Sequence, residues 1–155
     1  MKILKTTLLA ASLAFCFAGA NAQNSPSLLN EPDHNKPKIF SDLPTKMLVP
    51  ISQLESLLSL PVGAQVSKQV TTQFALIGKV VSKSTPGNNA FQSVVVNSTT
   101  RNGATFAFSR RTQPDGSVIY TGRMLSRQAG DVLVLHKEGD KYYFSKQGLY
   151  DLVNE

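Results

Sequence analysis

The fold is decided by residues 70–147, which read VTTQFALIGKVVSKSTPGNNAFQSVVVNSTTRNGATFAFSRRTQPDGSVIYTGRMLSRQAGDVLVLHKEGDKYYFSKQ. Short runs of β-branched and aromatic residues alternate with groups of Gly, Pro, Asn and Asp. The runs suit a pleated sheet surface, and the groups favour turns because these residues tolerate positive φ or pre-set φ. The turn groups lie at residues 84–89, 101–103, 113–116, 128–131 and 138–140. This pattern predicts strands joined by hairpins.

Six strands are predicted between these turns. Asn102-Gly103 is the strongest hairpin signal, because a type I′ turn needs positive φ at both central residues. No connection is long enough for the crossover that a parallel pair requires, so we expect an antiparallel meander. The strands are expected near residues 70–82, 91–98, 104–110, 118–127, 132–137 and 141–146.

The sheet is predicted to be strongly curved or barrel-like, because closure hides the strand edges that otherwise invite aggregation. Gly78 and Gly122 each lie in the middle of a predicted strand. A glycine there either marks a bend or bulge or only weakens the strand. The predicted fold class is mainly β: one antiparallel six-stranded meander with one short N-terminal helix.

That helix is predicted over about residues 52–60. Ser52 and Glu55 have the spacing of a capping box, and Pro61 ends the helix. Leucines at 54, 57 and 58 share one helical face. Because two helical turns are not stable alone, we expect the helix to cover the sheet, the alternative being a partner-binding helix.

Residues 1–22 have the pattern of a secretory signal peptide, with two early lysines, an apolar run and a small-x-small cleavage site ending at Ala22. The apolar run is too short to span a bilayer. A lipoprotein signal that uses Cys16 is disfavoured, because Phe15 precedes it where a small residue is usual. We therefore expect export by a cleaved signal, to the periplasm or the cell exterior.

Residues 23–46 are predicted to be a flexible linker. They contain four prolines among polar residues and sustain no apolar period, so they bury too little surface to offset the entropy of ordering. Ile39, Phe40 and Leu43 are expected to dock locally on the sheet. The β-rich domain then occupies residues 47–155.

The cysteine content excludes several chemistries. Cys16 is the single cysteine, so the 133 residues that follow the expected cleavage site contain none. A thiol nucleophile, a thiolate metal site and a disulfide are thereby excluded from the mature chain, which must be held together by its core.

The remaining residues show no pattern typical of an enzyme. His136 is the only histidine of the predicted domain, and no Gly-x-Ser-x-Gly sequence occurs. The acidic residues of the sheet region lie in predicted turns, which favour them for backbone reasons. Asp131, Glu138 and Asp140 lack the spacing of a calcium loop, and no phosphate-binding or zinc spacing is present. We predict no catalytic residue, no metal and no cofactor.

Charge is concentrated in the predicted sheet. The whole chain has a net charge of +6, and residues 70–147 contain ten basic and four acidic residues. A basic sheet face favours an anionic partner, either a protein or an anionic glycan, while nucleic acid is not expected in an exported protein. The candidate contact residues lie on two strands predicted to pair as a hairpin: Arg110, Arg111, Arg123 and Arg127.

The predicted function is therefore non-catalytic binding or interaction with an unknown ligand through a basic sheet face. One alternative is a lipocalin-like carrier of a small apolar ligand, although six strands are few for such a cavity. The other is a small hydrolase that uses turn carboxylates as acid and base.

Overall fold

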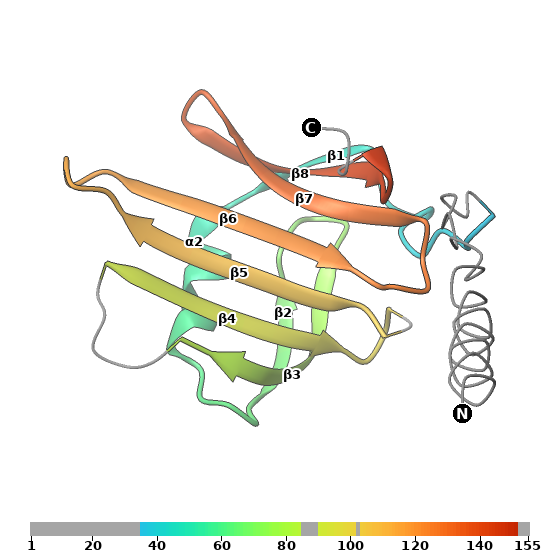
Figure 1. The fold of residues 1–155 in the computed structure, drawn as a ribbon, viewed down its shortest axis with the longest axis horizontal. Helices are drawn as coiled ribbons and strands as arrows, with labels where there is room; N and C mark the ends of the chain where they lie inside the picture. The colour runs from blue at the N-terminus through green and yellow to red at the C-terminus, as the bar shows by residue number, and fades with distance from the viewer. Residues whose placement is uncertain (1–34, 85–89, 102, 152–155) are drawn as a thin grey trace, which may run out of the picture. The chain divides into compact units, whose positions relative to one another are not determined.

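The computed structural model describes residues 35–84, 90–101 and 103–151 (Figure 1). The expected signal peptide, Cys16, the first half of the predicted linker (residues 23–34) and Asn102 lie outside these residues. Within the described ranges, no helix is long and apolar enough to cross a membrane.

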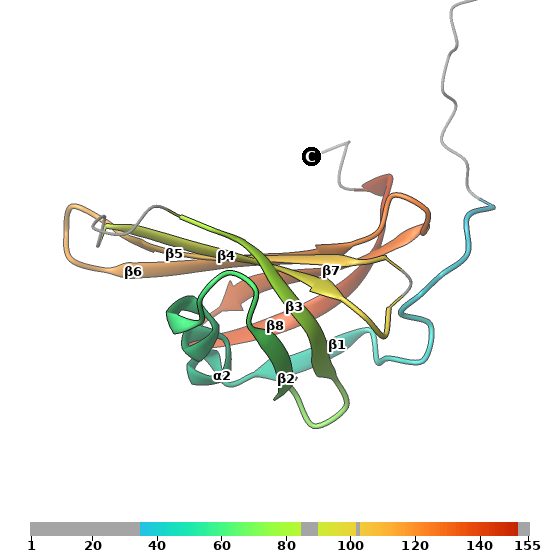
Figure 2. The ribbon, with the colours of Figure 1, turned by 90° about the horizontal axis from the view of Figure 1, so that it is seen from below.

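The described chain forms one antiparallel sheet in the order β1-β8-β7-β6-β5-β4-β3-β2. It curls into a half-barrel (Figure 2). A mainly β, curled antiparallel fold with one short helix is confirmed. The strands are β1 (Lys46–Val49), β2 (Gln65–Gln69), β3 (Ala75–Lys83), β4 (Phe91–Ser98), β5 (Thr105–Thr112), β6 (Val118–Leu125), β7 (Asp131–Glu138) and β8 (Lys141–Gly148).

The sheet has eight strands, so the predicted number of six is wrong. β1 and β2 were not predicted, and the strand expected over residues 70–82 begins only at Ala75. The residues before it form a turn, in which the Thr71 hydroxyl oxygen accepts hydrogen bonds from the N–H groups of Gln73 (3.2 Å) and Phe74 (3.0 Å). A threonine side chain therefore makes the turn that separates β2 from β3.

The helix is shorter than predicted. α2 (Ile51–Glu55) continues into a 3₁₀ turn, η2 (Ser56–Ser59). The predicted capping box is absent: Pro50 holds the N-cap position without a side-chain bond, and Glu55 instead accepts a hydrogen bond from the Tyr120 hydroxyl. α2 lies on the concave side of the sheet (Figure 2), where Leu54 and Leu57 are buried.

The core lies on the concave face and is built around aromatic rings. The Phe144 ring packs edge-to-face against Phe74 at 6.2 Å and against Phe106 at 5.9 Å between centroids. Phe106 also stacks on Phe108 at 6.2 Å. Such pairs add to the stabilisation from burial itself. The concave face is therefore a packed hydrophobic core.

The segment before β1 is tied to the sheet through Asp131. The Asp131 side chain is 2 % exposed, and its carboxyl oxygens accept hydrogen bonds from the N–H groups of Ile39 (2.8 Å) and Phe40 (2.9 Å). The Lys146 ammonium donates to the carbonyl oxygens of Phe40 (3.2 Å) and Leu43 (2.6 Å). The expected docking of these apolar residues is confirmed, and residues 39–46 belong to the β domain although the sequence places them in the linker.

Candidate functional site

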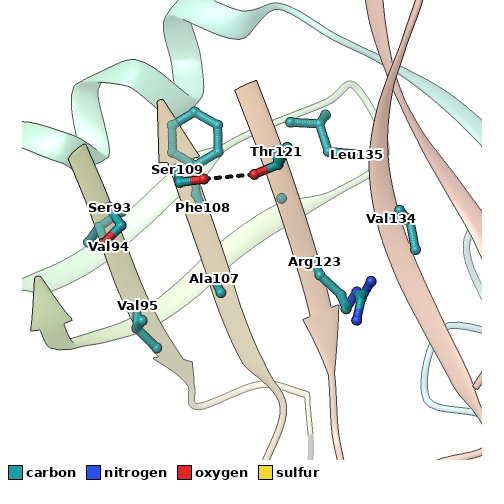
Figure 3. A pocket seen from close by; sticks show the side chains of 11 residues that line it. Ser93, Val94, Val95, Ala107, Phe108, Ser109, Thr121, Arg123, Val134 and Leu135 are labelled. Atoms are coloured by element: carbon teal, nitrogen blue, oxygen red, sulfur yellow. Dashed lines mark hydrogen bonds between the residues drawn. The ribbon is translucent and has the colours of Figure 1, made fainter. Parts of the chain in front are cut away.

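A shallow hollow of about 550 Å³, the outer groove, lies on the convex face over β4 to β7 (Figure 3). Alternation along the strands points one set of side chains to this face and the other set to the core. The outward side chains that line the groove are Ser93, Val95, Ala107, Ser109, Thr121, Arg123 and Val134.

Short side chains on the two central strands create the hollow. Ser109 pairs with Thr121 across β5 and β6, and their hydroxyl oxygens are hydrogen-bonded at 2.7 Å. Ala107 faces Arg123 in the same ladder, and the Arg123 side chain extends along the side of the groove toward β7 (Figure 3). The floor is thus made of short side chains, both polar and apolar, with one guanidinium at its edge.

The strands under the groove contain more basic than acidic residues. β4, β5 and β6 together contain three basic residues and no acidic residue, and Asp131 of β7 is buried and bonded to main-chain N–H groups. Glu138, on the neighbouring strand β7, is already engaged by Lys46 and by His136. Positive charge that is not balanced locally attracts anions and raises their concentration at the surface.

The structure brings Arg111 and Arg123 to the same face. Arg111 lies on the convex side, with its guanidinium carbon 5.8 Å from the centre of the Phe91 ring. In the β5–β6 ladder Arg111 pairs with Ile119 and Arg123 pairs with Ala107, four positions along. At about 3.3 Å per residue, their backbones are roughly 13 Å apart.

The other two predicted arginines lie elsewhere. Arg110 is adjacent to Arg111 on the same strand, so it points to the opposite face, where it neighbours Tyr120. Arg127 follows the end of β6, and its carbonyl oxygen accepts a hydrogen bond from Lys36 at 3.1 Å. The patch of four arginines that the sequence predicts is therefore divided between two faces and a loop.

Apolar side chains extend the groove toward the β5–β6 hairpin. A second hollow of about 290 Å³ shares Ser109 and Thr121 with the outer groove and is also lined by Phe91 and Ile119. The Phe91 and Ile119 side chains are 36 % and 43 % exposed. Neither residue was predicted from the sequence, because only the register shows which face of each strand is outward. Exposed apolar groups beside arginines are typical of interfaces.

Tyr120 joins the helix to the sheet on the opposite face. Its hydroxyl donates a hydrogen bond to Glu55 of α2, and its ring stacks on Phe108 with centroids 5.9 Å apart. Burial raises the pKa of the Tyr120 hydroxyl, and the bond to Glu55 raises it further, while Arg110 acts in the opposite direction. The folded protein therefore favours the neutral phenol.

Alkaline unfolding provides a test of this contact. Because the folded pKa of Tyr120 is raised, its contribution to stability is complete below the ordinary tyrosine pKa of about 10 and is lost as the pH rises through the folded value. Thermal melts between about pH 9 and pH 11 should show a steeper loss of stability for the wild type than for Tyr120→Phe. Glu55→Gln should reduce the difference, and equal slopes for wild type and Tyr120→Phe would contradict the contact.

A serine, a histidine and a carboxylate also meet on the convex face, at β7 and β8. The His136 Nε2 atom is 2.8 Å from Glu138 Oε1, and its Nδ1 atom is 3.3 Å from the Ser145 hydroxyl. Glu138 is shared with Lys46, whose hydrogen bond, followed by that of His136, lowers the pKa of the carboxyl. The Glu138 side chain is about half exposed.

This trio does not have the surroundings of a catalytic site. Acyl transfer needs donors arranged around a developing oxyanion in a site that excludes water. Ser145, His136 and Glu138 lie outside the outer groove and face solvent on an open sheet surface. The arrangement is better explained as cross-strand bonding that joins β1, β7 and β8.

Across the described ranges, no three His, Cys, Asp or Glu side chains form a group that could hold a metal ion. Comparison of the chain with protein-family models, with curated proteins and with solved structures yields no match.

Proposed function

We propose that this protein is a non-catalytic binding protein that holds an acidic partner protein in the outer groove. The observation that supports this proposal is the hollow itself, which is lined by Arg123 and by no acidic residue and continues toward Arg111 on the same face. With a signal peptide predicted over residues 1–22, the binding would take place in the periplasm or outside the cell.

The groove favours an extended acidic segment. Arg111 and Arg123 can each meet a carboxylate, because their guanidinium groups present several donors in one plane. The small floor of Ala107 admits a main chain close to the sheet, and Ile119 offers an apolar contact beside Arg111. A segment with an acidic residue at each end, and with an apolar residue next to the one that meets Arg111, would match this order.

Charge reversal gives a direct test. The double variant Arg111→Glu/Arg123→Glu should bind poly-glutamate about tenfold or more weakly than the wild type, because each exposed pair contributes up to about 1 kcal/mol and reversal adds repulsion. Fluorescence anisotropy at several salt concentrations measures the loss. The salt dependence should also become shallower in the variant, since fewer charges are screened.

The matched control changes the net charge by the same amount, but at positions away from the groove. Lys137→Glu/Lys141→Glu alters two exposed lysines of the β7–β8 hairpin and should reduce binding much less. An equal loss in both double variants would show that net charge, not the groove, attracts the probe. Heparin distinguishes the partner class: stronger binding of heparin than of poly-glutamate, lost in the arginine variant, would indicate an anionic glycan.

The carrier hypothesis has no comparable support. A carrier needs an open cavity on the concave face of its sheet. Here that face is packed by rings such as Phe106 and Phe144, which are 1 % and 0 % exposed, and is covered by Leu54 of α2.

A further inference from the structure

The half-barrel remains open between its two edge strands. β1 and β2 are the first and last strands in the order of the sheet, so neither has a second strand neighbour among the residues that the structure describes. A cleft of about 750 Å³, here called the seam, is lined by residues from both strands. Both edge strands lie beside α2, to its right, in Figure 2.

The seam has a closed floor and an open outer side. Met47 and Thr71 are 3 % and 5 % exposed, and the Thr71 hydroxyl lies 3.6 Å from the Met47 sulfur across the cleft. Gln53 of α2 and the turn after β2 also line the seam. Entry is therefore from the outside, where the Leu48 side chain is 51 % exposed.

The main chain of β1 directs free bonding groups toward the seam. The Lys146 N–H donates to the Thr45 carbonyl oxygen at 2.8 Å, which fixes the phase of the β1–β8 ladder. In an antiparallel ladder every second residue bonds to its neighbour strand, and the residues between point their N–H and C=O groups the other way. Met47 thus bonds to β8, and the main-chain groups of Lys46 and Leu48 point to the seam.

The main chain of β2 does the same from the other side. The Val70 N–H donates to the Phe74 carbonyl oxygen at 2.9 Å, which fixes the phase of the β2–β3 ladder. Lys68 therefore bonds to β3, and the main-chain groups of Ser67 and Gln69 point to the seam. Two rows of donors and acceptors line the cleft.

We propose that the seam binds an extended acidic segment of a partner protein as an added β-strand. A peptide main chain is the natural complement of a free strand edge, and alternate side chains then meet the floor and the solvent. Lys68 lines the cleft and no acidic residue does, which favours acidic over basic segments; Lys46, at the other edge, is already paired with Glu138. The exposed Leu48 offers an apolar contact at the same edge.

The order of strands also constrains the pairing. Successive antiparallel pairs make β1 and β2 run in opposite directions, so an added strand is antiparallel to one edge and parallel to the other. This site uses different strands from the outer groove, and its proposal does not depend on the proposed function of that groove.

A proline substitution at the edge of β2 tests the proposal. The probe is a labelled peptide of about eight residues that alternates glutamate and valine. Ser67→Pro removes the N–H that points into the seam, at an edge position where proline is tolerated, whereas Ser67→Ala keeps that N–H. We expect the alanine variant to bind like the wild type and the proline variant to bind at least about tenfold more weakly. No binding by the wild type, or equal binding by both variants, would overturn the proposal.

Hydrogen exchange on the unaltered protein provides a second measurement, which does not rely on the folding of any variant. Addition of the peptide should slow exchange at the amides of Lys46, Leu48, Ser67 and Gln69. Protection confined to the amides of other strands would overturn the proposal. Protection of these four amides that rises with protein concentration in the absence of peptide would also overturn it, because a second copy of the chain would then occupy the seam. A peptide that alternates lysine and valine should bind more weakly than the acidic probe.

Discussion

Gly78→Ala is expected to lower the free energy of unfolding by about 3 kcal/mol or more, measured by denaturant titration. A Cβ atom at Gly78 would lie 2.2 Å from the carbonyl oxygen of Asn97 and 2.9 Å from its carbonyl carbon. Both atoms belong to the main chain of the adjacent strand β4, which hydrogen bonds hold in place. Relief of the contact requires β3 and β4 to move apart, which breaks part of their ladder.

Gly122→Ala is the matched control in the same sheet. A Cβ atom there would lie 3.2 Å from the Leu135 Cβ and 3.3 Å from its Cδ2. The Cδ2 atom can rotate away, and the Cβ contact is relieved by a shift of a few tenths of an ångström, so we expect a loss of about 1 kcal/mol. If Gly78→Ala destabilised the protein no more than Gly122→Ala, the close approach of β3 to β4 would be contradicted.

Asp131→Ala is expected to lower the free energy of unfolding by about 3 kcal/mol and to release the segment before β1. The substitution removes the acceptor of the Ile39 and Phe40 N–H groups. The bond to Phe40 is buried, and each buried donor left without a partner costs about 1–3 kcal/mol. Hydrogen exchange should accelerate in residues 39–43 more than in β4 and β5, because the lost bonds act on that segment directly.

Asp42→Ala provides the comparison for this second prediction. Asp42 is also tied to a distant residue, since its two carboxyl oxygens accept hydrogen bonds from Arg101 at 2.6 Å and 2.8 Å. Its side chain is 58 % exposed, however, and an exposed ion pair contributes about 0–1 kcal/mol. Equal losses from the two substitutions would refute the role of Asp131 as the buried anchor.

The strands from β4 to β8 were predictable because their turns are local. Gly116 and Gly139 adopt φ values of +83° and +57° in the hairpins where the sequence placed turns. The expected strand at residues 91–98 coincides with β4. Alternation along the strands also separates buried side chains, among them Phe106 and Phe144, from exposed ones. Where a strand pairs with its neighbour in sequence, residue type and spacing contain most of the information needed.

The two edge strands could not be found in this way. β1 has four residues between Pro44 and Pro50, and its partner residues lie at positions 142–145, far along the chain. β2 has a single buried residue, Val66, so it shows no apolar alternation. Both depend on tertiary pairing, which a local pattern does not record. The seam between them could therefore not be predicted from the sequence.

The surface was only partly predictable for the same reason. A period of two already separates Arg110 from Arg111, but the position of Arg123 relative to Arg111 depends on the register of β5 and β6. Arg101 illustrates the limit: it was counted among the basic residues of the sheet region, yet its guanidinium is occupied by Asp42 and by the Ile39 carbonyl oxygen. Charge counts identify a basic domain, and only the pairing shows which charges remain for a ligand.

The pairing of β1 with β8 also sets an order of events during biosynthesis. Lys46 lies opposite Ser145, so β1 is synthesised before the other strands but cannot pair until β8 has been synthesised. The intervening hairpins can assemble in turn from neighbours in sequence, whereas this contact spans about a hundred residues and is entropically the slowest to close. A chain that emerges N-terminus first, from a ribosome or a translocation channel, therefore holds Phe40 and β1 in water until its last strand has followed.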